Sequence, residues 1–233
     1  MILRELNRCS DLHLNLCLRS DQNLNDKYKF DIKHKRPEDT HEGIFDFYDS
    51  DEVSKYAESK SLMNIQEKIT IRALELLELP QKEALILDLG CGPGFAGMYL
   101  SEIGYKVVSI DLLLDFLQYY DIKDLNPIQS DMSFLPFQPR TFDAVISISA
   151  LQWLHRSNST KETIKLVKYL AKDAYNVLKP SSKAIFQFYP KNNAVMEEIG
   201  KNFVESTQFK GGFVIDNPNS PKKRHIFLVL NKN

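Results

Sequence analysis

The chain has 233 residues, enough for one domain with a sizeable hydrophobic core. Its formal net charge of −1 excludes a global positive field, so any nucleic-acid contact must come from local basic patches. No apolar run approaches the roughly 18 residues of a membrane span, and the first residues lack a secretory pattern. We therefore expect a cytoplasmic protein, or a nuclear one in a eukaryote. The three cysteines (Cys9, Cys17 and Cys91) lack metal-ligand spacing, which predicts reduced thiols and no metal site.

Residues 1–35 are interpreted as an N-terminal extension. Between residues 12 and 18 every second residue is leucine, which is the period of a β-strand. The segment either adds a strand to a sheet or is a poorly ordered extension. A basic cluster follows at residues 33–36.

The next segment, residues 36–80, is predicted to form a helical cap. An aromatic stretch at residues 45–48 precedes a single helix-like run from residue 51 to residue 77. Apolar residues recur in this run at roughly helical spacing, and Pro80 ends it.

From residue 84 onward, strand-like and helix-like segments alternate, which indicates a parallel sheet with helices on both faces. Strands are predicted at residues 84–89, 106–111, 126–130, 142–149, 183–189, 212–216 and 225–231. Helices are predicted at residues 94–102, 113–120, 160–178 and 193–206. Only residues 217–224 join the last two strands, too few for a parallel crossover, so these strands run antiparallel to one another. The predicted fold class is α/β: a Rossmann-like, seven-stranded, mostly parallel sheet with an antiparallel last strand.

A glycine-rich turn follows the first of these strands. Gly90, Gly92 and Gly94 remove side chains there, so the backbone can approach a ligand closely. Asp111 ends the next strand, where such folds place a carboxylate that binds ribose hydroxyls. Asp88 would repel a pyrophosphate but suits a ligand with an amino group and a sulfonium, as in S-adenosylmethionine. The turn resembles motif I of class I methyltransferases; the alternative is a tight turn whose glycines only relieve crowding.

Further candidates lie beyond the carboxyl ends of the other strands, where ligands of such sheets bind. Asp131 and Met132 end the third strand and suit an adenine, held by its amino group and one face. Trp153, Tyr189 and Asn219 follow later strands and could surround one pocket near the methyl group. Core packing is the alternative for these three. Within the glycine turn, the cysteine is interpreted as a small turn residue, with a catalytic thiol as the alternative.

Several longer motifs resemble one family. They are Gly-Cys-Gly-Pro-Gly-Phe-Ala-Gly (90–97), Ser-Ile-Ser-Ala-Leu-Gln-Trp-Leu (147–154), Gln-Phe-Tyr-Pro (187–190), Gly-Gly-Phe-Val-Ile-Asp-Asn-Pro-Asn-Ser (211–220) and Arg-Ala-Leu-Glu-Leu-Leu (72–77). Together they resemble the bud-site-selection ribosomal RNA methyltransferases, class I enzymes that use S-adenosylmethionine to methylate guanine N7 in small-subunit rRNA. The resemblance implies a methyltransferase domain at residues 36–233, divided into the helical cap and a core at residues 84–233. Eukaryotic members carry a basic C-terminal tail that this chain lacks, which favours an archaeal or otherwise tail-less relative.

The resemblance and the strand ends together give a set of expected site residues. The expected cofactor-binding residues are Tyr56, Asp88, Gly90, Cys91, Gly92, Gly94, Asp111, Leu112, Asp131, Met132 and Ser147. The expected substrate-binding residues are Gln152, Trp153, Tyr189, Asn219, Lys222, Lys223 and Arg224. Guanine N7 already presents a lone pair, so we expect no catalytic acid, base or metal, only alignment of N7, methyl and sulfur. Trp153, Tyr189 and Asn219 are the positioning candidates, and aromatic stacking would offset part of the cost of unstacking the base. For the basic residues 222–224 a solvated turn is the alternative to phosphate binding.

A partner protein is expected at one sheet edge. Residues 112–120 are apolar almost all round, and they precede the strand at 126–130 that would lie at an open edge. The resemblance implies a heterodimer with a small zinc-binding activator protein that docks by strand pairing. The alternative is that residues 1–30 cover this surface. The other expected partner is small-subunit rRNA or a pre-ribosomal particle, with no membrane.

Two other functions stay open at the level of sequence. The same core could methylate a small molecule or a protein side chain. The chain could also be a ribosome-assembly factor whose scaffolding role outweighs its catalysis.

Overall fold

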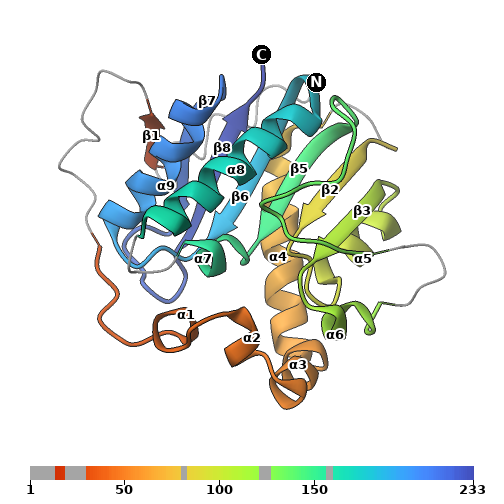
Figure 1. Ribbon diagram of the computed structural model, residues 1–233, viewed down its shortest axis with the longest axis vertical. Helices are drawn as coiled ribbons and strands as arrows, with labels where there is room; N and C mark the ends of the chain where they lie inside the picture. The colour runs from red at the N-terminus through yellow and green to blue at the C-terminus, as the bar shows by residue number, and fades with distance from the viewer. Residues whose placement is uncertain (1–13, 19–29, 80–82, 121–126, 156–159) are drawn as a thin grey trace, which may run out of the picture.

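A computed structural model describes residues 14–18, 30–79, 83–120, 127–155 and 160–233. Among them lies one eight-stranded sheet with the order β1-β7-β8-β6-β5-β2-β3-β4 (Figure 1). Its strands are β1 (Leu14–Leu18), β2 (Leu85–Leu89), β3 (Lys106–Asp111), β4 (Ile128–Gln129), β5 (Phe142–Ile148), β6 (Leu178–Phe188), β7 (Lys210–Asp216) and β8 (His225–Asn231). The strands from β2 to β6 are parallel, whereas β8 is antiparallel to both β6 and β7. The predicted antiparallel last strand is therefore confirmed.

The leucine-rich N-terminal segment adds a strand to this sheet. Strand β1 pairs antiparallel with β7, with Leu16 opposite Phe213. Of the two alternatives for this segment, the added strand is the one observed, and it makes β1 an edge of the sheet opposite β4.

Helices cover both faces of the sheet, as predicted. One face carries α7 (Leu151–Leu154), α8 (Lys161–Val177) and α9 (Asn193–Ser206), and the other carries α4 (Lys60–Leu77) and α5 (Phe95–Glu102) (Figure 1). Helix α8 buries Val167, Leu170 and Ala174 at helical spacing against the sheet. Because β5 is covered on both faces, Ala144 and Val145 are both inaccessible to solvent. Two apolar cores thus hold the sheet rigid beneath the site.

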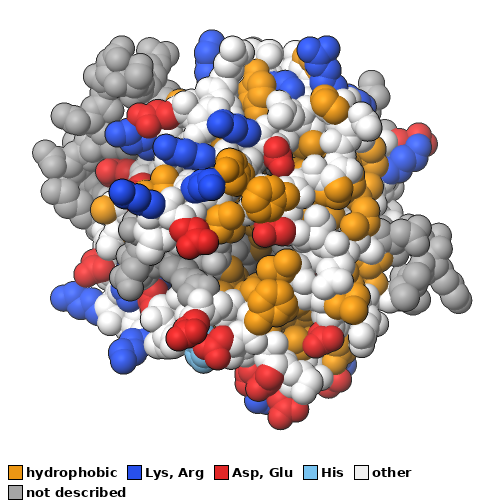
Figure 2. Space-filling view, viewed as in Figure 1, with side chains coloured by type: hydrophobic (Ala, Val, Ile, Leu, Met, Phe, Trp, Pro, Cys, Tyr) orange, Lys and Arg blue, Asp and Glu red, His pale blue; other side chains and the backbone are white. Residues whose placement is uncertain are grey.

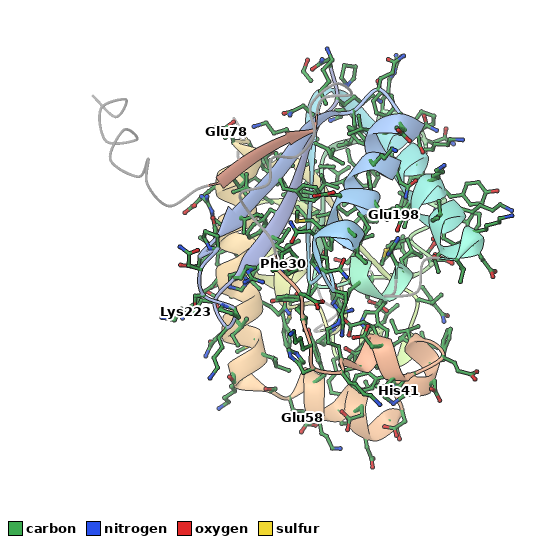
Figure 3. The ribbon with its side chains drawn as sticks, turned by 90° about the vertical axis from the view of Figure 1, so that its left-hand side faces the viewer. Phe30, His41, Glu58, Glu78, Glu198 and Lys223 are labelled. Carbon is green, nitrogen blue, oxygen red and sulfur yellow. The ribbon has the colours of Figure 1, made fainter. Side chains whose placement is uncertain are left out.

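The cap differs from the prediction of one helix over residues 51–77. Two helices occupy this stretch, α3 (Ser50–Ala57) and α4, because the Ser59 hydroxyl accepts a hydrogen bond from Leu62 N and begins a new helix. The single-turn helices α1 (Pro37–Thr40) and α2 (Ile44–Phe47) precede them. These short helices lie across one end of the sheet, as the positions of His41 and Glu58 show (Figure 3).

The edge region is shorter than predicted. Helix α6 (Leu114–Leu117) is a single turn instead of a helix over residues 113–120, and β4 contains only two residues. Phe116 is buried whereas Leu114 is 52% exposed, so the apolar segment has one face in the core and one in solvent. Residues 121–126 lie outside the described residues, so part of the predicted edge strand does too. No described helix is both long and apolar enough to cross a membrane.

Candidate functional site

Two hollows meet at the carboxyl end of the parallel strands. The first extends from the glycine turn to Gln66, and the second extends to Asp131. The residues that line both are Ile44, Gly90, Asp111, Ala150 and Trp153. The site is therefore one elongated cleft with two ends.

The three glycines of the turn have different roles. All have positive φ, at +70° for Gly90, +55° for Gly92 and +94° for Gly94. A Cβ on Gly90 would lie 2.4 Å from Ala150 Cβ, and one on Gly94 would lie 2.5 Å from the Tyr120 ring. A Cβ on Gly92 would meet no atom within 4 Å. Relief of crowding thus explains two glycines, whereas Gly92 leaves open space in the first hollow.

Two buried carboxylates flank this turn. Burial, and next the Asp111 charge, raise the pKa of Asp88 to about 7. Asp88 Oδ2 is buried with no hydrogen-bond partner among the described residues. Burial also raises the pKa of Asp111, although its carboxylate accepts hydrogen bonds from Gly92 N at 2.8 Å and Leu113 N at 2.9 Å. Two neighbouring carboxylates of this kind favour a ligand that brings positive charge and hydrogen-bond donors.

The cysteine of the turn is not activated. Cys91 is 8% exposed, and burial, followed by the charges of Asp88 and Asp111, raises the pKa of its thiol well above the ordinary value. The thiolate is the reactive form of cysteine, so this environment argues against a catalytic thiol. The interpretation as a small turn residue fits the structure.

Aromatic side chains form part of the lining of the first hollow. Tyr48 packs on Trp153 with ring centroids 5.4 Å apart, and Tyr56 stacks on Phe95 at 6.0 Å. Phe116 contacts both tyrosines, at 5.0 and 5.6 Å. Burial raises the pKa of Tyr56 to about 12, so its hydroxyl stays protonated. Aromatic ring faces beside buried carboxylates suit a ligand cation whose charge lies over a ring.

A polar network lines the same hollow and was missed by the sequence analysis. Gln66 Nε2 donates to Tyr56 Oη and to Ser149 Oγ, both at 3.2 Å. Ser149 Oγ donates to Gln187 Oε1 at 2.9 Å, and Ser149 has φ of +59°. Strained backbone of this kind is common at functional sites. Gln66 carried a sequence signal as a polar residue on the buried face of a helix. Ser149 and Gln187 lie within the motifs at residues 147–154 and 187–190, but those motifs did not indicate that the two side chains bond to each other.

The second hollow contains both residues predicted to hold an adenine, Asp131 and Met132, and it tests a third predicted cofactor residue, Ser147. Leu112, Asp131 and Met132 line it together with Asp111. Asp131 Oδ1 accepts a hydrogen bond from Ser133 N at 2.7 Å, which fixes the carboxylate at the end of β4. Ser147 lies elsewhere: it is fully buried, its hydroxyl donates to Leu89 O, and it lines neither hollow. Because side chains alternate along a strand, Ser147 points to the opposite face of the sheet from its neighbour Ile148, which lines the first hollow.

The predicted substrate residues are only partly brought together. Trp153 lines both hollows, whereas Gln152 lines neither, and its Nε2 donates to Ser149 O at 2.6 Å. Tyr189 is half-buried beside Ser149 and Gln187, and burial raises the pKa of its hydroxyl. Asn219 is different, because it is exposed on the loop between β7 and β8 and lines neither hollow.

The basic residues after Asn219 have unlike surroundings. Lys222 and Lys223 are exposed, and Lys223 lies to one side of the cap (Figure 3). Arg224 instead donates to Pro218 O at 3.3 Å, and its guanidinium lies over the Phe30 ring at 4.7 Å. Of the three basic residues 222–224, Lys222 and Lys223 are therefore the ones exposed together at the surface.

The basic cluster at residues 33–36 also divides. Arg36 is buried and paired with Glu38 at 3.0 Å and Asp39 at 2.7 Å, and it donates to Tyr189 O. Lys191 binds Asp39 from the other side at 3.1 Å. This arginine therefore fastens the cap to the end of β6, while residues 33–35 are solvent-facing or nearly so.

No group of three or more His, Cys, Asp or Glu side chains that could hold a metal ion occurs among the described residues.

Comparisons with known proteins agree with this geometry. Residues 87–186 match the profile of a methyltransferase domain. The 18S rRNA (guanine-N(7))-methyltransferase of Bos taurus is 38% identical over 190 residues, which cover 79% of this chain and 67% of that protein. The Mus musculus enzyme of the same name is 38% identical over 206 residues, covering 85% and 72%. An S-adenosylmethionine-dependent methyltransferase from Aquifex aeolicus matches the fold with a TM-score of 0.57, over 80% of this chain and all of the other, at 17% identity.

Proposed function

The chain belongs to the family of 18S rRNA (guanine-N7)-methyltransferases, and from this premise we propose that it transfers a methyl group from S-adenosylmethionine to guanine N7 in small-subunit rRNA. It is a methyltransferase with the class I fold. The observation that carries the choice of cofactor is the pair of buried carboxylates, Asp88 and Asp111, on either side of a bare glycine turn.

The residues of the cleft fit this cofactor. Asp88 Oδ2 would accept from the amino group of the methionine portion, since it has no other described partner. Asp111 already accepts one N–H on each oxygen, and each oxygen retains a lone pair for a ribose hydroxyl. Asp131 and Met132 would hold the adenine, and Leu112 would cover it in the second hollow. Gly92 would leave room for the backbone to approach the ligand.

The protein side of the reaction is positioning and exclusion of water. When bound, S-adenosylmethionine supplies an electrophilic methyl group on a sulfonium. Trp153 lines both hollows where they join, so we assign it to the guanine beside that methyl group. Its stacked contact with the base would offset part of the cost of unstacking, and the aromatic wall would favour the positive purine that forms. Tyr189 would contribute a hydrogen bond, and no side chain needs to remove a proton.

We propose that the activator protein binds at the β4 edge. Leu114, Tyr119 and Ile128 are 52%, 38% and 37% exposed, which leaves apolar side chains in water beside an open strand. The N–H of Ser130 donates to Asp111 O in β3, so the N–H of the preceding residue, Gln129, points away from the sheet. An added strand could pair there and bury these side chains. Because β4 is hydrogen-bonded to Asp111, a partner that orders β4 would also affect cofactor binding.

A labelled-methyl assay tests the proposed function. The chain, co-purified with its partner, is incubated with S-adenosylmethionine labelled in the methyl group and with unmethylated small-subunit rRNA or precursor particles. Label is expected in N7-methylguanine at one position of the RNA. Label in a co-purified protein or a small molecule instead would favour the alternative substrate classes.

A further inference from the structure

The face of the molecule that carries helix α8 combines positive charge with exposed aromatic rings. Lysines recur along this helix at positions 161, 165, 168 and 172, which are spaced by four, three and four residues and so share one stripe. Lys161, Lys165 and Lys172 are exposed and Lys168 is half-buried. No described carboxylate forms an ion pair with any of the four. Figure 2 shows the Lys and Arg side chains gathered here beside a hydrophobic patch.

An aromatic pair adjoins this stripe. Phe134 is 55% exposed, and its ring packs on that of Tyr169 with centroids 5.4 Å apart. Lys165 Nζ lies 5.4 Å from the centroid of the Tyr169 ring. The Leu135 N–H donates to Asp173 Oδ2 at 2.9 Å, which ties the loop of Phe134 to α8.

We propose that this face binds single-stranded RNA, with a base stacked on Phe134 and phosphates paired with Lys165, Lys168 and Lys172. Lysines about 5–6 Å apart along a helix suit successive phosphates, and any base can stack on an aromatic ring. An acidic protein would satisfy the lysines but would not need the aromatic pair. The proposal rests on the proposed function, which requires an RNA substrate. Because the net charge of the chain is −1, contacts to that RNA must come from a local basic patch such as this face.

The face lies beside the cleft. Phe134 follows Asp131 and Met132 in one loop, and both of these line the second hollow. Helix α8 follows α7, which carries Trp153. Nucleotides next to an unstacked target guanine could therefore continue from the cleft across this face, which would hold the strand in a fixed register.

The test is binding of a ten-nucleotide single-stranded RNA to the full chain with its partner, measured by fluorescence anisotropy over a range of salt. A Lys165→Gln, Lys168→Gln, Lys172→Gln variant is expected to lower the slope of log affinity against log salt by about 2, since each single-strand phosphate contact contributes about 0.7. Phe134→Ala is expected to weaken binding on the order of tenfold with an unchanged slope. The matched control is Lys60→Gln, Lys68→Gln, Lys106→Gln, which changes the charge equally at exposed sites elsewhere.

The outcomes separate this proposal from the proposed function. Equal binding by the two triple variants, binding of duplex RNA as tight as single-stranded RNA, or binding only to a protein of the particle would overturn it. Cofactor uptake, measured by calorimetry, should be the same in all variants and confirms that they are folded. If the face variants methylate and bind RNA as the parent does, only this inference fails; if no variant and no parent transfers methyl, the proposed function fails.

Discussion

Asp88 is the residue whose chemistry is most unlike that of an ordinary carboxylate. It is 1% exposed, its Oδ2 has no described partner, and its pKa is raised to about 7. Desolvation is the larger cause and Asp111 the smaller. The desolvation cost of a buried carboxylate is offset when a ligand supplies the missing hydrogen-bond donor or positive charge. A cationic amino group would supply both.

Cofactor affinity should therefore depend on pH through Asp88. A cation needs the ionised carboxylate, whose fraction in the free protein falls as pH drops below about 7. The affinity for S-adenosylmethionine is expected to rise nearly tenfold per unit from low pH toward pH 7 and to level off above it. Asp88→Asn should bind S-adenosylmethionine weakly, and its affinity should lack the part of the pH dependence that comes from ionisation of Asp88. Calorimetry between pH 5.5 and 8.5 checks this, and parallel profiles for the two proteins would refute it.

At the scale of elements, the glycine turn offers a matched pair of substitutions. Gly92 and Gly104 both have positive φ, and neither would place a Cβ within 4 Å of another atom. Alanine at either site should cost about 1–2 kcal/mol of unfolding free energy for the left-handed backbone. Only Gly92→Ala fills the first hollow, so only it should weaken cofactor binding, by a factor on the order of one hundred. Urea unfolding and calorimetry together measure both effects, and equal loss of affinity in Gly104→Ala would count against the placement.

The cap depends on one buried arginine. Arg36→Met would leave Glu38 buried without its arginine and would remove one of the cations beside Asp39; breaking a buried ion pair typically costs about 3–5 kcal/mol. The loss of stability should appear as faster proteolysis of residues 30–58. The affinity for the cofactor should also fall, because α2 contributes Ile44 to both hollows. Lys33→Met, at an exposed position of the same segment, is the control. Identical cleavage of the two variants would show that the arginine does not hold the cap.

Elements with strong periodicity were predictable from the sequence, and contacts between distant segments were not. Strand β3 and helix α9 begin and end as predicted because hydrophobic pattern alone decides them. The break between α3 and α4 was missed because one hydroxyl, on Ser59, outweighs a continuous apolar pattern. That Asp88, Asp111 and Trp153 line one hollow was predictable because the ends of parallel strands meet at one edge of a sheet. Gln187 was missed because its role depends on Ser149, reached only through folding.

At the scale of the whole molecule, the open β4 edge beside the cofactor cleft has an unpaired backbone and exposed apolar side chains, which a partner protein could cover. Gln129→Pro would remove the N–H that points away from β3 and leave the bond from Ser130 to Asp111 in place. We expect it to prevent formation of the heterodimer. Gln129→Ala is the control, since it removes the same side-chain bond to Leu112 O but keeps the N–H. Co-purification with the activator protein measures both, and capture of the proline variant in normal yield would exclude strand pairing at β4.

The methyltransferase and scaffolding accounts make different statements about the molecule as a whole. If the cleft is used for catalysis, Asp111→Lys must abolish the modification while the folded chain persists. If growth survives this change but not loss of the chain, the protein's presence matters more than the reaction.

The most direct measurement is a map of N7-methylguanine in small-subunit rRNA, obtained by chemical cleavage at the methylated base, from cells that contain the parent chain or the Asp111→Lys variant. The account predicts one cleavage site with the parent and none at that site with the variant. An unchanged site in the variant, or no site that depends on the parent chain, would contradict it.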